Sequence, residues 1–193
     1  MEVFNNVNSI FRIIVSEKLK FGNVAVDATV GNGNDIEYIL KKVGQRGFVY
    51  GFDIQEIAIK NTENRLLENI CSKNFKLICD GHENVDKYID RNIDFAVFNL
   101  GYLPKSDHSV ITKASTTIAS IEKLKNILNP SGLIVISAYL GHKGGMEEYL
   151  KLLEYTKSID QRNFNVARLD FVNQVNTPPK MILIEKRTNK NVK

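Results

Sequence analysis

The sequence contains little cysteine and no long apolar run. Its two cysteines, Cys71 and Cys79, have neither the spacing of a metal or redox motif nor the density of a disulfide-rich secreted domain. The absence of any apolar segment long enough for export or for spanning a membrane predicts a cytoplasmic protein. No repeat or Pro/Gly/Ser-rich linker divides the 193 residues, so we expect one domain over residues 1–187 and a basic tail over 188–193.

The net charge of the chain is also small. Its formal charge is +4, and the last nine residues supply +3 of it, so the body is nearly neutral. A phosphate-binding face needs clustered Lys and Arg, so this balance permits a nucleic-acid partner without indicating one. Candidates for phosphate contacts are Lys105, Lys113, Lys143 and Arg168, and the alternative is that they are exposed, solubilising side chains.

Short apolar runs alternate with segments of helical period, which is typical of a parallel α/β sheet. We expect strands at 23–28, 47–52, 75–79, 93–98 and 133–139, and helices at 6–19, 34–43, 56–69, 85–89, 112–128 and 146–159. Two further runs, 164–171 and 180–186, have no helix between them and predict a closing antiparallel pair. By analogy this is a Rossmann-type fold on the class I methyltransferase plan, with a mostly parallel seven-stranded sheet covered by helices on both faces.

The loop after the first strand has the sequence DATVGNGND, residues 27–35. In parallel sheets ligands bind beyond the carboxyl ends of the strands, and Gly31 and Gly33 permit a sharp turn and close backbone approach there. Ile36 stands where a dinucleotide fingerprint has its third glycine, and Asp27 places a carboxylate beside the loop. That carboxylate disfavours a pyrophosphate and suits an α-ammonium group, so a cofactor bearing an amino acid is favoured over NAD.

Acidic and amide side chains follow the second and third strands. Asp53 lies 22 positions after Gly31, where adenosine-binding Rossmann folds use a carboxylate to accept both ribose hydroxyls. The alternative role of Asp53 is to cap the following helix, and Gln55 is open to the same two interpretations. The third strand ends at DGHE, residues 80–83, which offers hydrogen-bonding groups at the level of an adenine ring; Asp80 alternatively caps the short helix.

The fourth strand runs into FNLGYLP, residues 98–104, which resembles the Asn-Pro-Pro-Tyr signature of amine methyltransferases with Leu and Gly in place of the prolines. In that signature the Asn side chain and a following carbonyl accept hydrogen bonds from the target amine, and the aromatic ring packs on the substrate. We therefore expect Asn99 and Tyr102 at the reacting amine, although a simple tight turn is the alternative. Asp107 and His108 are candidates for steering and deprotonating the amine.

The three histidines follow three successive predicted strands and should meet at one rim. His82, His108 and His142 come after the third, fourth and fifth strands. A zinc site built from them is the rival hypothesis, but methyl transfer needs no metal and we expect none. We assign Tyr139, His142 and Asn173 to the substrate side; the stretch around Asn173 alternatively closes the turn between the last two strands.

The ordered motifs DATVGNGND, GFDIQ, DGHE, FNLGYLP, DH, TTI, GHKGG and NQVNTPP are more specific than a generic Rossmann pattern. Over nearly the whole chain they resemble one bacterial family, long labelled as rRNA methylases and later assigned as tRNA 5-aminomethyl-2-thiouridine methyltransferases. The resemblance implies S-adenosylmethionine (SAM) as methyl donor, a tRNA anticodon stem-loop as substrate and a homodimer. It also implies cofactor contacts at Asn32, Asn34, Asp53, Gln55, Gly81 and His82.

Other functions remain open on the residues alone. A SAM-dependent methyltransferase of rRNA or of a small-molecule amine shares the cofactor half of the argument. An oxidoreductase is disfavoured by Ile36 and Asp27. A non-catalytic RNA-binding module predicts no cofactor binding and no need for the 98–104 motif.

Overall fold

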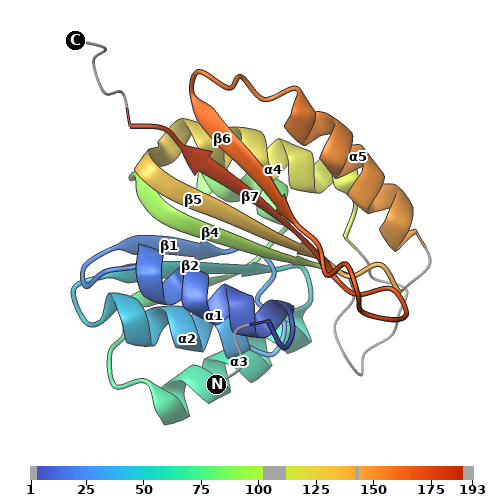
Figure 1. Ribbon diagram of the computed structural model, residues 1–193. Helices are drawn as coiled ribbons and strands as arrows, with labels where there is room; N and C mark the ends of the chain where they lie inside the picture. The colour runs from blue at the N-terminus through green and yellow to red at the C-terminus, as the bar shows by residue number, and fades with distance from the viewer. Residues whose placement is uncertain (1–3, 102–111, 142–143, 189–193) are drawn as a thin grey trace.

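A seven-stranded sheet, in the order β3-β2-β1-β4-β5-β7-β6, runs through the described part of the molecule (Figure 1). The computed structural model describes residues 4–101, 112–141 and 144–188. The first five strands pair in parallel, β7 pairs antiparallel with β5, and β6 pairs antiparallel with β7 at the sheet edge. The strands are β1 Val24–Asp27, β2 Phe48–Asp53, β3 Phe75–Cys79, β4 Ile93–Leu100, β5 Leu128–Ala138, β6 Phe164–Leu169 and β7 Lys180–Lys186.

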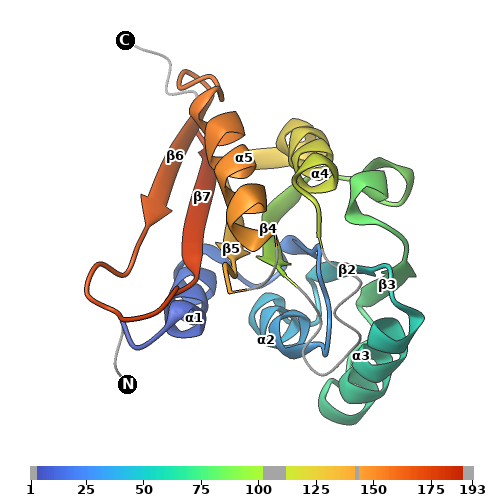
Figure 2. The same ribbon diagram turned by 90° about the vertical axis from the view of Figure 1, so that its right-hand side faces the viewer.

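Helices cover both faces of this sheet (Figures 1 and 2). One layer contains α1 Val7–Lys18, α2 Asn34–Val43 and α3 Glu56–Asn69; the other contains the 3₁₀ helix η1 His82–Lys87, α4 Ala114–Ile127 and α5 Gly145–Lys157. Successive strand residues face opposite layers, so Ala25 and Phe95 lie in the core with α1 and α2, whereas Val26 and Phe98 lie in the core with α4 and α5. Burial on both sides explains why the central strands are almost wholly apolar.

The predicted α/β architecture, the mostly parallel seven-stranded sheet and the terminal antiparallel pair are confirmed. Two boundaries differ from the prediction by three residues or more. Strand β5 begins at Leu128 instead of residue 133, because Leu128 pairs with Ile93; the register then shifts, and regular pairing resumes at Leu133 with Phe95. The short helix begins at His82, three residues earlier than predicted. None of the helices in the described ranges is long and apolar enough to cross a membrane.

Helix α1 lies across the sheet beside α2 and brings polar residues to the carboxyl ends of the strands. Its N-terminus is capped by Asn6, whose Oδ1 accepts a hydrogen bond of 2.9 Å from the Ser9 N–H. Its apolar face is buried, and the Phe11 ring packs 6.3 Å from the ring of Phe95. This packing determines where Asn8 and Arg12, on the same helix, are held.

Gly44 ends α2 with a φ of 63°, and an added Cβ would lie 2.3 Å from ring atoms of Phe21. We expect Gly44→Ala to lower the free energy of unfolding by about 1–2 kcal/mol, because a side chain is strained in the left-handed region and also meets the ring. Urea denaturation measures this loss. In a Phe21→Ala background the ring is gone, so the loss should shrink to the backbone part; an equal loss in both backgrounds would contradict the steric contribution.

Candidate functional site

The loop between β1 and α2 lies at the carboxyl edge of the sheet and approaches its neighbours closely. Gly31 has a φ of 52° and Gly33 a φ of 77°, so both glycines adopt the left-handed backbone that the sequence led us to expect. At Gly33 an added Cβ would lie 2.8 Å from the hydroxyl oxygen of Thr62 on α3. The adjacent Asn32 and Asn34 are exposed, and Asn34 begins α2. The loop therefore presents backbone groups and two amide side chains at the start of a helix.

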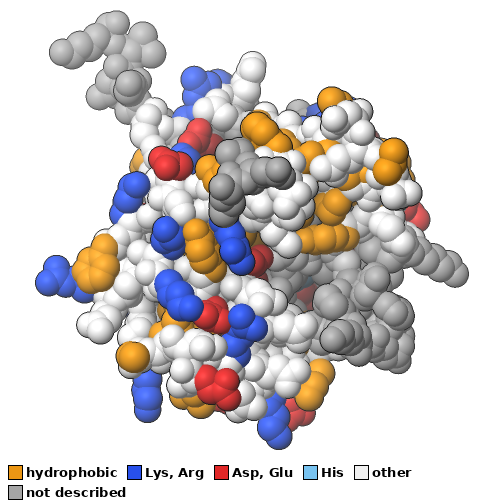
Figure 3. Space-filling model, turned by 60° about the horizontal axis from the view of Figure 1, so that its bottom comes forward, with side chains coloured by type: hydrophobic (Ala, Val, Ile, Leu, Met, Phe, Trp, Pro, Cys, Tyr) orange, Lys and Arg blue, Asp and Glu red, His pale blue; other side chains and the backbone are white. Residues whose placement is uncertain are grey.

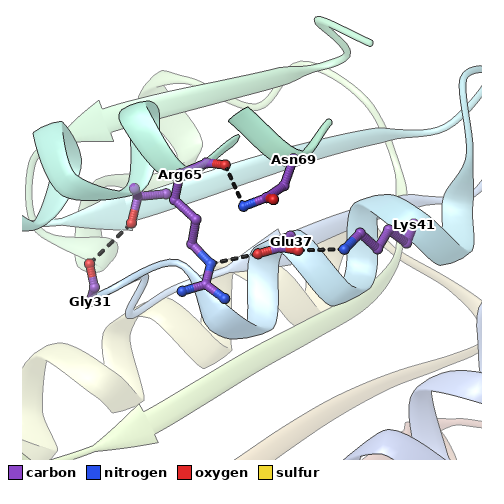
Figure 4. A network of polar contacts seen from close by, with 6 residues as sticks. Gly31, Glu37, Lys41, Arg65 and Asn69 are labelled. Atoms are coloured by element: carbon purple, nitrogen blue, oxygen red, sulfur yellow. Dashed lines mark hydrogen bonds and ion pairs between the residues drawn. The ribbon is translucent and has the colours of Figure 1, made fainter. Parts of the chain in front are cut away.

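Thr62 is a residue of this site that the sequence analysis missed. Its hydroxyl donates a hydrogen bond of 3.0 Å to the Gly31 carbonyl, which ties the loop to α3 (Figure 4). Thr62 is fully buried on the helix face that also carries Ala58 and Leu66. A polar residue within an otherwise apolar helical stripe, at a spacing of four, was the available clue.

Asp53 holds the same loop from the strand side. Its Oδ2 accepts a hydrogen bond of 3.0 Å from the Gly31 N–H, and its Oδ1 accepts one of 2.9 Å from the Gln55 N–H. Burial raises the pKa of this half-buried carboxyl. Helix α3 is capped by Gln55, without a side-chain hydrogen bond, so the alternative that Asp53 is its N-cap is wrong. Each carboxylate oxygen has capacity for a second donor, as ribose hydroxyls require.

Ile54 is a second residue that the sequence analysis missed. It lies between Asp53 and Gln55, and 59% of its surface is exposed although it follows a buried strand. An exposed aliphatic side chain beside a ribose-type carboxylate offers a surface on which a flat aromatic ring can pack. The clue was an apolar residue placed beyond the strand end, where polar residues otherwise predominate.

Two more acids lie under and beside the loop. Asp27 is completely buried, and its Oδ1 accepts a hydrogen bond of 3.1 Å from the Thr29 N–H. Burial, followed by the neighbouring negative charge of Asp35, raises the pKa of Asp27 well above its ordinary value. Burial likewise raises the pKa of Asp35. Asp27 thus binds the backbone of the loop from its buried side. Its predicted contact with an ammonium group stays a prediction.

The residues after β3 form a compact polar turn. Asp80 accepts hydrogen bonds from the Gly81 N–H, the Asn84 amide and the Tyr88 hydroxyl, at 2.7, 2.9 and 2.8 Å. The Tyr88 bond contributes most to lowering the pKa of Asp80. Asp80 therefore holds the turn before η1 together, but the N-cap of η1 is Gly81 without a side-chain hydrogen bond, so the alternative that Asp80 caps this helix is wrong.

His82 is buried at the junction of this turn with the glycine loop. Its Nδ1 lies 3.1 Å from the Ala28 carbonyl oxygen, and its ring meets the edge of Phe98 at 5.4 Å. Burial lowers the pKa of His82, so the imidazole is neutral and Nδ1–H is the donor. Nε2 has no partner in the described residues. His82 is therefore an uncharged group whose Nε2 can accept a hydrogen bond from a ligand.

The end of β4 is bonded directly to the glycine loop. The Asn99 N–H donates to the Thr29 hydroxyl at 2.7 Å, and the Asn99 Nδ2 donates to Asp35 Oδ2 at 2.8 Å. Because the amide nitrogen is engaged, its Oδ1 is the group left to accept from a ligand. The next carbonyl, that of Leu100, accepts from the Tyr139 N–H at 3.1 Å.

Tyr139 and Asn173 were predicted on the substrate side. Tyr139 is 36% exposed, and its hydroxyl donates to Asn8 of α1 at 3.4 Å. Burial and the charge of Asp35 raise the pKa of Tyr139, so it remains a neutral phenol. Asn173 is exposed in the β6–β7 connection, which lies at the end of β7 that pairs with the carboxyl end of β5 (Figure 1). Tyr139 is thus beside Asn99, and Asn173 lies at the same end of the sheet.

Gly101, directly after β4, and Thr112, just before α4, are bound to each other and form a clamp. The Thr112 N–H donates to the Gly101 carbonyl at 3.3 Å, and the Gly101 N–H donates to the Thr112 hydroxyl at 3.2 Å. The same hydroxyl donates to buried Glu148 of α5 at 2.9 Å. The chain therefore leaves and re-enters the fold at one point.

Six predicted residues lie outside the described residues: Tyr102, Lys105, Asp107, His108, His142 and Lys143. Within residues 4–101, 112–141 and 144–188, no group of three His, Cys, Asp or Glu side chains is arranged to hold a metal ion. The zinc hypothesis needs His108 and His142, so it is not tested by this finding.

Comparison with known proteins identifies relatives of this fold and site. Residues 49–185 match the family described as "Putative rRNA methylase". The chain is 32% identical to the chloroplastic tRNA (mnm⁵s²U34)-methyltransferase of Arabidopsis thaliana over 92% of this chain and 68% of that protein. A solved structure from Clostridium thermocellum, described in the same words as the family, has a TM-score of 0.90 at 44% identity, covering 94% of this chain and 98% of its own.

A second solved structure is informative about the ligand. A Streptococcus mutans protein described as a methyltransferase, in complex with S-adenosylhomocysteine (SAH), matches with a TM-score of 0.84 at 38% identity, over 93% of this chain and 97% of that one. SAH is the product that SAM leaves after methyl transfer.

The sheet order, the glycine loop and the strand-end acid together define a SAM-dependent methyltransferase with the class I fold. The chain belongs to the family of RNA-modifying enzymes described as rRNA methylases. The predicted cofactor, SAM, and the predicted family are confirmed.

Replacing the buried acid should change how stability depends on pH. Because the folded-state pKa of Asp27 is raised above 3.8, its favourable contribution is complete below that pH and is lost as the pH rises through the folded-state pKa. Asp27→Asn should therefore raise the melting temperature of the ligand-free protein at pH 7, and the gain should shrink as the pH falls toward 4.

The exposed variant Asp90→Asn is the control, since Asp90 lies at the surface. A difference between Asp27→Asn and the wild type that is the same at every pH would show that the buried charge is not its cause.

Proposed function

We propose that this protein uses SAM to N-methylate the 5-aminomethyl group of 2-thiouridine at the wobble position of cytoplasmic tRNA. The Arabidopsis relative, whose name states that modification, supports the choice of nucleoside because it aligns with 92% of this chain. Support for an amine as acceptor comes from Asn99, whose amide oxygen remains available beside the glycine loop. The anticodon stem-loop as binding partner and a homodimer as the active form are part of the proposal.

On the cofactor side, the proposed contacts follow the loop and the strand ends. SAM supplies a methyl group on a sulfonium centre that a nitrogen lone pair can displace. Asp53 would accept the ribose hydroxyls, and Ile54 would pack against the adenine ring. The remaining proposed contacts are Asp27, Gly31, Asn32, Gly33, Asn34, Gln55, Gly81 and His82.

The described residues fit such a ligand in two respects. The left-handed Gly33 packs against the Thr62 side chain, where any other residue would be strained, so the backbone of the loop is held in place at the start of α2. The buried Nε2 of His82 and Oδ2 of Asp27 have no partners in the described residues, so polar capacity remains on both sides of the loop.

On the acceptor side, the amine must be oriented and must lose a proton. The Asn99 Oδ1 and the Leu100 carbonyl oxygen are proposed to accept hydrogen bonds from the two N–H groups of the neutral amine. This arrangement points the lone pair of the nitrogen away from both oxygens. Asp35 locks the Asn99 amide so that its oxygen, and not its nitrogen, is presented. This orientation is productive only for the unprotonated amine, because an ammonium has no lone pair that can attack the methyl group.

Deprotonation is a large part of the barrier. An aliphatic amine with a pKa of about 10.4 needs roughly 4–5 kcal/mol to lose its proton at pH 7. Desolvation between the strand ends lowers that cost. Asp107 and His108 are proposed to steer the amine and to take the proton, Tyr102 to pack on the nucleoside, and Tyr139, His142 and Asn173 to bind around it.

A specific observation keeps rRNA as a second candidate substrate. A Mycoplasmopsis pulmonis protein named ribosomal RNA small subunit methyltransferase H is 38% identical over 37% of this chain, although that match covers only 24% of the relative. The partial match supports shared cofactor binding better than a shared substrate.

Nucleoside mass spectrometry of a deletion strain tests the substrate. We expect 5-aminomethyl-2-thiouridine to accumulate in tRNA and its N-methylated product to disappear, with recovery when the wild-type gene is restored. Normal methylated tRNA in the deletion strain would defeat this assignment. A missing methyl group in rRNA instead would favour the second candidate.

Asn99→Ala should slow single-turnover methyl transfer by about 10²-fold at saturating SAM and tRNA, because the amine loses its orienting acceptor. SAH affinity, measured by calorimetry, should stay near the wild-type value. Asn165→Ala, at an exposed position of β6, is the matched control and should transfer methyl groups normally. Equal rates for wild type and Asn99→Ala would exclude the proposed role.

In the same assay, Asp107→Asn and His108→Ala should each slow transfer. If both left it unchanged, neither residue would be the base.

A further inference from the structure

A strip of basic side chains crosses the face formed by α1 and α2, away from the cofactor loop. The basic strip consists of Arg12 on α1, Lys42 in the last turn of α2 and Arg46 just beyond it. Arg12 and Arg46 are exposed and Lys42 is half-buried. Figure 3 shows Lys and Arg side chains on this face of the molecule, with hydrophobic, Asp and Glu side chains among them.

The three cations of the strip have no acidic partner. Within the described residues no carboxylate lies within 4.0 Å of Arg12, Lys42 or Arg46. Glu37 is the acid of α2 nearest in the sequence to Lys42, and it is already bound by both Lys41 and Arg65 (Figure 4). None of the three cations is therefore engaged in a salt bridge within the described residues, although the charge of Arg12 acts on Asp35 from a longer distance.

Aromatic rings hold these cations in place. Arg12 and Lys42 each lie 5.5 Å from the centre of the Tyr38 ring, and Arg46 lies 5.7 Å from the centre of the Phe21 ring. The Tyr38 hydroxyl is 3.0 Å from that of Ser16, which orients the ring. Cations supported on ring faces lose less side-chain freedom when they bind an anion than cations on free stems do. Phe21 is 62% exposed and offers its own ring face.

The strip starts at the acceptor end of the site. The positive charge of Arg12 acts on Asp35, which holds Asn99, and Asn8, one turn earlier on α1, accepts from Tyr139. From Asp35 to Lys42 helix α2 advances about 10 Å, so the cations lead away from Asn99 along one helix. A polymer with a reacting group at Asn99 and regularly spaced negative charges would follow this line.

We propose that Arg12, Lys42 and Arg46 bind the phosphates of the RNA strand that flanks the target nucleotide. The inference rests on the proposed function, in that the substrate is RNA. Phosphates complement cations that form no salt bridge, and the exposed Phe21 ring beside them suits a nucleotide, because bases stack on aromatic faces. The proposal does not involve the four candidates for phosphate contacts that the sequence suggested, which are Lys105, Lys113, Lys143 and Arg168.

The test is the salt dependence of RNA binding by Lys42→Gln/Arg46→Gln. The probe is a fluorescent RNA anticodon stem-loop carrying 5-aminomethyl-2-thiouridine, and affinity is followed by anisotropy between 50 and 200 mM KCl, a range over which phosphate contacts weaken binding steeply. Each lost contact should lower the slope of log K against log[salt] by about 0.7–0.9, which corresponds to a five- to eightfold loss of affinity at about 0.1 M salt. SAH affinity should be unchanged, because neither residue touches the cofactor loop.

Lys157→Gln is the matched control, since Lys157 is exposed at the end of α5 in the other helix layer. Wild-type affinity and slope in the double variant would overturn the proposal. Loss of binding to vesicles of anionic lipid, with RNA binding intact, would also overturn it. Single-turnover methylation of the same stem-loop separates the two inferences: RNA that is bound through the strip but never methylated contradicts the proposed function and leaves the strip standing.

Discussion

The backbone of Gly31 is held from both sides by hydrogen bonds, and the rest of the site depends on these two bonds. Its N–H is bound by Asp53 at the end of β2, and its carbonyl is bound by Thr62 of α3. The same loop also contributes the Thr29 hydroxyl and the Asp35 carboxylate that position Asn99. A displacement at Gly31 would therefore reach Asp53, the proposed ribose ligand, and Asn99, the proposed ligand of the amine, at the same time. The proposed cofactor contacts and the proposed acceptor contacts thus depend on the same loop.

Three carboxyl groups are crowded at this point, and the protein stabilises them unevenly. Asp53 and Asp35 each receive hydrogen bonds from neighbouring amides, whereas one oxygen of Asp27 has no partner in the described residues. Burial raises the pKa of all three. Holding negative charge in a poorly solvated place costs stability in the ligand-free protein, and a cationic ligand offsets that cost. This is the electrostatic reason why a sulfonium-bearing amino-acid cofactor suits the loop better than a pyrophosphate.

The succession of strands and helices along the chain, the cover of helices on both faces of the sheet and the strand-end residues were predictable from the sequence, because each depends on local periodicity and on a general rule about parallel sheets. Asp53 and Asn99 could be named because they directly follow apolar runs. Thr62 and Ile54 could not, since their roles come from tertiary contact: one reaches the loop from another helix, and the other is exposed where its residue type suggests burial. The start of β5 was misplaced because Leu128 pairs with Ile93 across the sheet, which no local pattern reveals. The basic strip was also hidden, because its members are spread over two helices and their net charge is cancelled elsewhere in the composition.

The clamp between Gly101 and Thr112 has an evolutionary consequence. The two ends of the segment, Gly101 and Thr112, are held together by their backbone and hydroxyl hydrogen bonds, and the Thr112 hydroxyl is also bound to buried Glu148. These contacts involve only the two ends of the segment, so they would persist if its length changed, and loop-closure entropy changes slowly with length. A family built on this scaffold can acquire new acceptors by rewriting one segment while its donor chemistry is inherited intact.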